Sequence, residues 1–105
     1  MITTTTNTVE GYKITGYFGL VGSEVVNGVN FTKDFGAGIR NFIGGRNGGY
    51  EKEILKAKKD AYEELVDRAS QLGADAVIGI QVNFETLNQM LVLTMDGTAV
   101  KLEKL

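Results

Sequence analysis

The sequence of 105 residues predicts a single α+β domain that spans residues 1–105. Two observations lead to this fold class. One long amphipathic helical pattern covers residues 50–72, and segments with the composition of strands lie both before and after it. Strands, then helices, then strands is the order expected when a sheet packs against helices as a separate layer. We therefore expect a small antiparallel or mixed sheet packed by one long and one short helix.

Two extended segments precede the helices. The threonine run in residues 2–6 favours a short strand, because β-branched residues fit a pleated surface. Residues 13–27 alternate apolar and small side chains, with glycine at Gly16, Gly19 and Gly22. Three glycines in one strand indicate bulges, strong twist or the close approach of another backbone.

Two helices are predicted in the middle of the chain. Residues 32–43 carry apolar side chains at helical spacing, and Gly44-Gly45 ends that short helix. The long helix ends at Gly73, which stands where a C-terminal capping glycine belongs. Its apolar positions recur every three or four residues: Ile54, Ala57, Ala61, Leu65, Ala69 and Leu72.

The apolar surface of the long helix is wider than one sheet face requires. Leu55, Tyr62 and Val66 extend the apolar arc to about half of the circumference. A second partner, such as another subunit, is therefore expected. On the outer, polar part of the helix, Glu64 and Arg68 are spaced for an ion pair.

The last third of the chain predicts three extended segments. Residues 76–84 alternate apolar and polar side chains, as a half-buried strand does. Residues 90–95 are apolar on both faces apart from Thr94, which indicates a central strand or one covered by another subunit. Asp96-Gly97 predicts a two-residue hairpin turn that returns the chain through residues 98–102.

Composition excludes several classes of function. The chain contains no cysteine and no histidine, so thiolate sites, imidazole ligands and the usual general base at neutral pH are absent. Eleven basic and thirteen acidic residues give a formal net charge of -2 without a basic run, which argues against nucleic acid as a partner. The first residues lack the pattern of a signal peptide, and no segment is long and apolar enough to span a bilayer. We expect a cytoplasmic protein without a resident cofactor.

The joint before the long helix is the main candidate site. It contains Arg40, Gly44, Gly45 and Arg46 and leads into Tyr50. Glycine-rich backbone lets N–H groups approach a ligand, and a helix N-terminus adds partial positive charge, so the joint is suited to a phosphate, carboxylate or other anion. The alternative is a tight connection whose arginines pair with carboxylates of a neighbouring subunit. The alternative is favoured, because the joint lacks the strand and the Lys-Ser/Thr ending of a P-loop.

Lys58 and Glu51 complete the candidate ligand-binding set. A helical projection places Lys58 near the middle of the apolar arc, with Glu51 two turns earlier on nearly the same line. A lysine in that position must extend its amine to water, pair with a carboxylate or meet a ligand. Pairing across a subunit boundary or extension to water is the simpler interpretation. The sequence predicts no catalytic residue and no metal ligand.

Short motifs over nearly the whole chain resemble the YbjQ-like family of small uncharacterised bacterial proteins. They are Thr4-Thr5, Glu10-Gly11, Gly22-Ser23-Glu24, Ile39-Arg40, Gly44-Gly45-Arg46, Tyr50-Glu51, Leu72-Gly73-Ala74-Asp75-Ala76-Val77 and Gly97-Thr98-Ala99-Val100. The resemblance implies an α+β subunit that assembles into a ring-shaped homopentamer. It also implies heavy-metal binding, although soft metals select thiolate and imidazole ligands, and the chain has neither.

Three functions follow as expectations. The first is a non-enzymatic homo-oligomer, five subunits in the resemblance, that binds or scaffolds a ligand still to be identified. The second is a small-molecule or anion site at the subunit junction, with enzymatic activity, that uses Arg40, Arg46, Lys58 and Tyr50. The third is the metal binding that the resemblance implies. The first is favoured.

Overall fold

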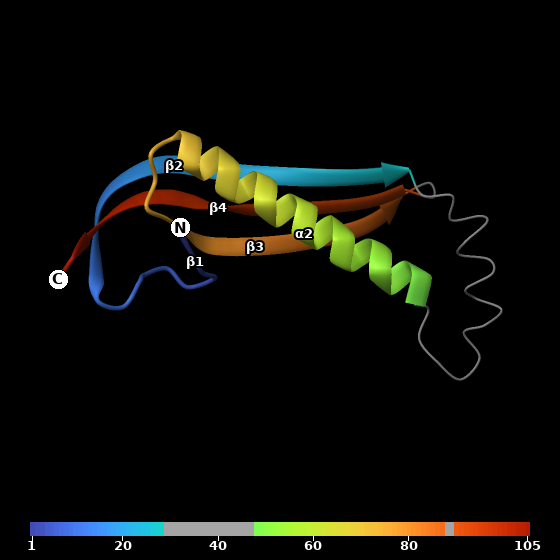
Figure 1. Cartoon of the computed structure of the whole chain (residues 1–105), viewed down its shortest axis with the longest axis horizontal. Coiled ribbons are helices and arrows are strands. Elements are labelled where there is room, and N and C mark those ends of the chain that lie inside the picture. The colour runs from blue at the N-terminus through green and yellow to red at the C-terminus, as the bar shows by residue number, and fades with distance from the viewer. Residues whose placement is uncertain (29–47, 88–89) are drawn as a thin grey trace.

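The computed structural model describes residues 1–28, 48–87 and 90–105, which form four strands and one helix (Figure 1). The elements are β1 (Ile2–Thr3), β2 (Tyr12–Gly28), α2 (Gly48–Gln71), β3 (Ala76–Leu87) and β4 (Met90–Lys104). The strands form one mixed sheet in the order β1-β3-β4-β2. Among these described strands, β1 pairs with β3 in parallel, and the other two pairs are antiparallel. The predicted α+β class is confirmed, whereas the short helix predicted over residues 32–43 lies outside the described residues.

The first predicted strand is shorter than expected. β1 covers Ile2–Thr3 instead of residues 2–6, and it pairs with the start of β3. The residues that follow still lie along β3, because the Gly79 N–H donates to the Thr6 carbonyl at 2.8 Å and the Ile80 N–H to the Thr4 carbonyl at 3.1 Å. The register of β3 with β4 shifts between Ile78 and Gln81.

β2 confirms the predicted extended segment and its irregularities. Its register with β4 shifts between Ile14 and Gly16 and again between Tyr17 and Gly19. Gly19 has a φ of 102°, a backbone conformation that L side chains rarely adopt. The glycines of this strand therefore mark bulges, as the sequence predicts.

α2 crosses one face of the sheet diagonally (Figure 1). Its fully buried side chains follow one line at intervals of four residues: Ala57, Ala61, Leu65 and Ala69. They pack in one core cluster with Val21 of β2 and with Leu91, Leu93 and Met95 of β4. The helix ends close to the predicted position, and Gly73 has the positive φ, 82°, of a C-terminal cap.

The hairpin turn predicted at Asp96-Gly97 is wrong. Both residues lie inside β4, where Asp96 pairs with Gly22 on one side and Gln81 on the other. β3 and β4 stay paired as far as Leu87 and Met90. Gly97 is buried, and an added Cβ would lie 2.6 Å from Val77 Cγ1. The glycine therefore serves close packing between strands, a role that its dipeptide context does not distinguish from a turn.

The opposite face of the sheet is covered only in part. Ala76, Ile78 and Val100 form a second buried cluster there, against which Ile2, Val9, Ile14 and Leu102 pack. Farther along the strands, residues of that face such as Leu20 and Val26 are 79% and 48% exposed. Among the described residues no helix covers this half, which is called the open face below.

One buried polar group joins the helix to the sheet. Ser23 of β2 is 4% exposed, and its hydroxyl donates to the Ala61 carbonyl at 2.6 Å. We expect Ser23→Ala to lower the free energy of unfolding by about 1 kcal/mol, the usual net value of such a hydrogen bond. Urea unfolding measures it. Ser70→Ala on the exposed side of α2 is the matched control and should shift stability by less than about 0.5 kcal/mol. Equal effects would show that the buried bond contributes nothing.

Candidate functional site

The structure leaves most of the predicted glycine-rich site untested. Arg40, Gly44, Gly45 and Arg46 lie outside the described residues. Tyr50 and Glu51 lie in the first turns of α2. The anion or assembly junction at this joint therefore stays a prediction.

Lys58 lies outside the buried surface of α2 in the single chain, which agrees with extension of its amine to water, and its pairing with a carboxylate or a ligand stays a prediction. Lys58 is exposed, although Ala57 beside it is fully buried. Residues four apart advance by about 40° around a helix, so the buried line drifts from Ala57 towards the direction of Leu65 and Ala69. In a helical projection Lys58 and Leu65 point in nearly the same direction, since they are seven residues apart. Because α2 crosses the sheet diagonally, this direction faces the sheet at Leu65 but not at Lys58, two turns earlier (Figure 1).

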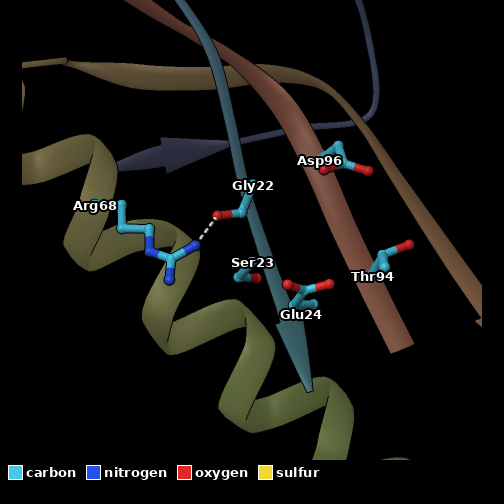
Figure 2. A pocket seen from close by; sticks show the side chains of 6 residues that line it. All are labelled: Gly22, Ser23, Glu24, Arg68, Thr94 and Asp96. Carbon is cyan, nitrogen blue, oxygen red and sulfur yellow. Dashed lines mark hydrogen bonds between the residues drawn. The ribbon is translucent and has the colours of Figure 1, made fainter. Parts of the chain in front are cut away.

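A polar pocket lies where α2 passes the outer strand β2, and Figure 2 shows its side chains. Its volume is about 220 Å³. The lining residues are Gly22, Ser23, Glu24, Arg68, Thr94 and Asp96. They come from three elements, so the pocket exists only in the folded chain.

Arg68 closes one side of this pocket. Its Nη1 donates to the Gly22 carbonyl at 2.5 Å, drawn as the dashed line in Figure 2, and its Nη2 pairs with Glu64. Because β2 is the outer strand of the described sheet, some of its carbonyls have no neighbouring strand to bind them. The guanidinium satisfies one of them. The Glu64–Arg68 pair expected from the sequence is confirmed.

Glycine at position 22 makes room for the Asp96 carboxylate. An added Cβ at Gly22 would collide with Asp96 Oδ1. Asp96 also lines a second shallow pocket of about 220 Å³ with Leu20, Gly79, Gln81, Gly97 and Thr98. The two pockets therefore adjoin at this carboxylate on the open face.

The open face is acidic. Strand pairing forms three rows across β2, β4 and β3. The first row is Glu24, Thr94 and Asn83, and the second is Gly22, Asp96 and Gln81. The third row is Val26, Val92 and Glu85. Paired residues share a face of a sheet, so Glu24, Asp96 and Glu85 lie on one surface. The strand stretches that form this surface, residues 20–26, 81–85 and 92–98, contain no lysine or arginine.

The geometry of both pockets suits surface recognition better than chemistry on an enclosed substrate. Sites that enclose small molecules usually have about 300–1,000 Å³ and mostly apolar walls. The pocket around Arg68 is smaller, and its walls are mostly polar or charged. Catalysis in such a place would need a base and an electrophile to converge on one atom. Here the one cation, Arg68, is bound to Gly22 and Glu64.

The donor set does not fit a soft metal. Thiolate and imidazole, the ligands that zinc, copper(I) and cadmium select, are absent from the whole chain. Among the described residues, no three carboxylates are grouped closely enough to hold an ion. No helix in the described ranges is long and apolar enough to cross a membrane.

The described residues thus define a small two-layer α+β protein in which a helix crosses one sheet face and the open face presents acidic and apolar side chains. A family described as "Putative heavy-metal-binding" matches residues 1–103. A UPF0145 protein of Listeria grayi is 51% identical, over 98% of this chain and all of that protein. Another from Bifidobacterium longum strain DJO10A is 48% identical, over 99% of this chain and 97% of that protein. The chain belongs to this family, as the sequence motifs indicate.

A solved structure supports the fold. The crystal structure of a protein of unknown function from Pediococcus pentosaceus ATCC 25745 matches with a TM-score of 0.60 at 20% identity. The match covers 98% of each chain. At that identity the likeness bears on the fold alone.

The acidic open face is not predicted from the sequence. Glu24, Glu85 and Asp96 are far apart in sequence, and only the pairing of β2, β4 and β3 brings them together. A signal was present: the alternate positions of these strands carry acids, amides and hydroxyls but no basic residue. Reading it required the strand order, which local patterns do not contain.

Proposed function

We propose that this chain is a homo-oligomeric binding or scaffolding protein without catalytic activity, and that its subunits form a closed ring. The observation that supports the proposal most directly is the number of large apolar side chains that a single chain leaves in water. Tyr17 is 71% exposed, Leu20 79% and Leu55 59%. Apart from the terminal Met1 and Leu105, the others more than 40% exposed among the described residues are Phe18, Val26, Tyr62, Leu72, Val82 and Phe84.

These side chains are not scattered singly. Tyr17, Phe18, Leu20 and Val26 all belong to β2, which is the outer strand of the described sheet. A long outer strand with exposed apolar side chains is a template for association unless something covers it. Contiguous exposed apolar surface usually marks an interface. Burying it between copies also helps a chain of this size, because a small domain buries a limited share of its surface alone.

The family resemblance implies five subunits in the ring, and this number forms part of the proposal. Most soluble oligomers are closed and symmetric, so a defined number of copies is expected in place of open association. The ligand of the assembled protein is the remaining unknown. The description of the family names heavy metals as the ligand, but the chain has no cysteine or histidine, the residues that soft metals select.

Native mass spectrometry of the protein purified from its own cells tests the proposal. We expect one dominant species at about five times the mass of the 11.4 kDa chain, at micromolar concentration. The same spectrum reports any ligand that stays bound, as a mass increment. Light scattering on the same sample is the control for dissociation in the gas phase. A monomer in both measurements would contradict the proposal.

A further inference from the structure

We propose that the open face of one copy receives a ridge on α2 of the next copy, so that subunits associate head to tail. The ridge is defined as Lys52, Leu55, Lys59, Tyr62 and Val66. This inference rests on the proposed function and deepens it, because it names the two surfaces that meet. The occupant of the open face is thus a second copy of this chain.

The ridge is a geometric unit on the helix. Its members follow one another at intervals of three and four residues, so their side chains line one side of α2. Leu55 is 59% exposed and Tyr62 42%, and both lysines are exposed. Within the described part of the chain, the Tyr62 hydroxyl forms a hydrogen bond with Thr3 Oγ1 at 3.0 Å, and Val66 is half-buried. An apolar row flanked by cations is therefore left accessible.

The open face carries the complementary pattern. Leu20, Val26 and Val92 supply apolar surface, and Glu24, Glu85 and Asp96 supply negative charge. No basic residue occurs in the strand stretches that form it. One cation at its rim, Arg68, is bound to Glu64 and to the Gly22 carbonyl.

The lengths of the two surfaces agree. From Leu20 to Val26, six residues of strand span roughly 20 Å. From Lys52 to Val66, fourteen residues of helix span about 21 Å. A helix can therefore lie along the open face with its ridge in contact over the full length of the exposed strand segment.

The charges also agree in spacing. Glu24 and Glu85 stand two strands and two residues apart, which corresponds to about 12 Å between their Cα atoms. Lys52 and Lys59 are seven residues apart on the helix, or about 10.5 Å. Within the described part of the chain, none of these four side chains makes an ion pair. The line between the two glutamates runs obliquely across the strands, so a helix that lies along the strands passes between them, with each glutamate Cα roughly 5 Å to one side. A lysine side chain can cover that distance, so both lysines can meet both glutamates at once.

Contact between two different surfaces has a structural consequence. A copy that donates its ridge still offers its open face to another, so the contact repeats with the same geometry. Such head-to-tail repetition closes into a ring when the rotation per subunit fits. A two-fold dimer, in contrast, would use one surface twice.

Charge reversal tests the inference on the full chain. Glu24→Lys with Glu85→Lys changes the open face, and Lys52→Glu with Lys59→Glu changes the ridge. Each double variant places like charges opposite each other, so we expect its assembly to weaken at least about 100-fold. In an equimolar mixture each variant complements the other, so we expect alternating complexes of the two, although a ring of five cannot close from alternating copies. The chain that carries all four substitutions should assemble alone.

Native mass spectrometry and light scattering measure the outcome, and circular dichroism shows that each variant is folded. Asp60→Lys with Glu103→Lys is the matched control for the open-face variant, since it makes the same change of net charge at exposed positions off both surfaces. It should assemble like the parent. If a lysine substitution prevents folding, Glu24→Gln with Glu85→Gln provides the test and should weaken assembly about 10-fold or more.

Three outcomes would overturn the inference, and they differ in whether they also contradict the proposed function. Reversed variants that assemble like the parent, while the parent is an oligomer, would show that other surfaces join the copies and would leave the proposed function standing. Double variants that dissociate, together with a folded chain of all four substitutions that does not assemble, would exclude the pairing of these two surfaces. A monomeric parent would contradict both the inference and the proposed function.

Discussion

Leu65→Ala is expected to lower the free energy of unfolding by about 2–5 kcal/mol, a large part of the stability of a domain of this size. Leu65 is fully buried in the cluster between α2, β2 and β4. Among residues 51–71 of the helix it is the only large side chain that is fully buried, since the other fully buried residues there are Ala57, Ala61 and Ala69. Alanine at 65 would leave a cavity that no neighbour on the helix can fill.

Urea unfolding followed by circular dichroism measures the effect. Leu105→Ala removes the same atoms from a side chain that is 81% exposed, so it should change stability by less than about 0.5 kcal/mol. The difference between the two leucines separates burial from the general effect of the substitution. A loss below about 1 kcal/mol at Leu65 would mean that the core between helix and sheet is loosely packed.

Where local chemistry decides an element, the sequence predicts it. The helix over residues 50–72 is found as Gly48–Gln71, since its periodicity and its terminal glycine act within a few turns. The extended segment of residues 13–27 is found as Tyr12–Gly28, with a bulge at Gly19. The first strand and the strand of residues 76–84 are also present, with shifted ends.

Where distant parts of the chain decide, the sequence does not predict the result. Asp96-Gly97 has the local chemistry of a turn, but Gly22 on one strand and Val77 on another determine what fits at these two positions. Lys58 is exposed because α2 crosses the sheet diagonally, and a projection of one helix does not take that crossing into account. The acidic open face depends on strand order in the same way. Of the glycine-rich joint before Tyr50, Gly48 and Gly49 belong to α2, and residues 44–47 lie outside the described residues, so the proposed site there stays a prediction.

Gly97→Ala is expected to destabilise the fold by about 1–3 kcal/mol or more, although alanine adds a single methyl group. Its Cβ would lie 2.6 Å from Val77 Cγ1 and 3.0 Å from both the Ile78 carbonyl oxygen and Ile80 Cγ1. Val77 is fully buried in the core, and the Ile78 oxygen belongs to the backbone of β3. The neighbours cannot withdraw without moving the strand or opening the core.

The matched control is Gly16→Ala in β2. A Cβ there would meet Lys101 Cβ at 3.5 Å, an ordinary contact, and Gly16 has no positive φ. We expect this variant to be neutral or stabilised by up to about 1 kcal/mol, because alanine restricts the unfolded chain.

A double-mutant cycle then identifies the cause of the loss at Gly97. Val77→Ala removes the methyl group that collides with the added Cβ. The double variant should therefore lose less free energy of unfolding than the sum of the two single losses, by at least about 0.5 kcal/mol. Strict additivity in urea unfolding would show that the two positions are not in contact, and Gly97 would then need another explanation.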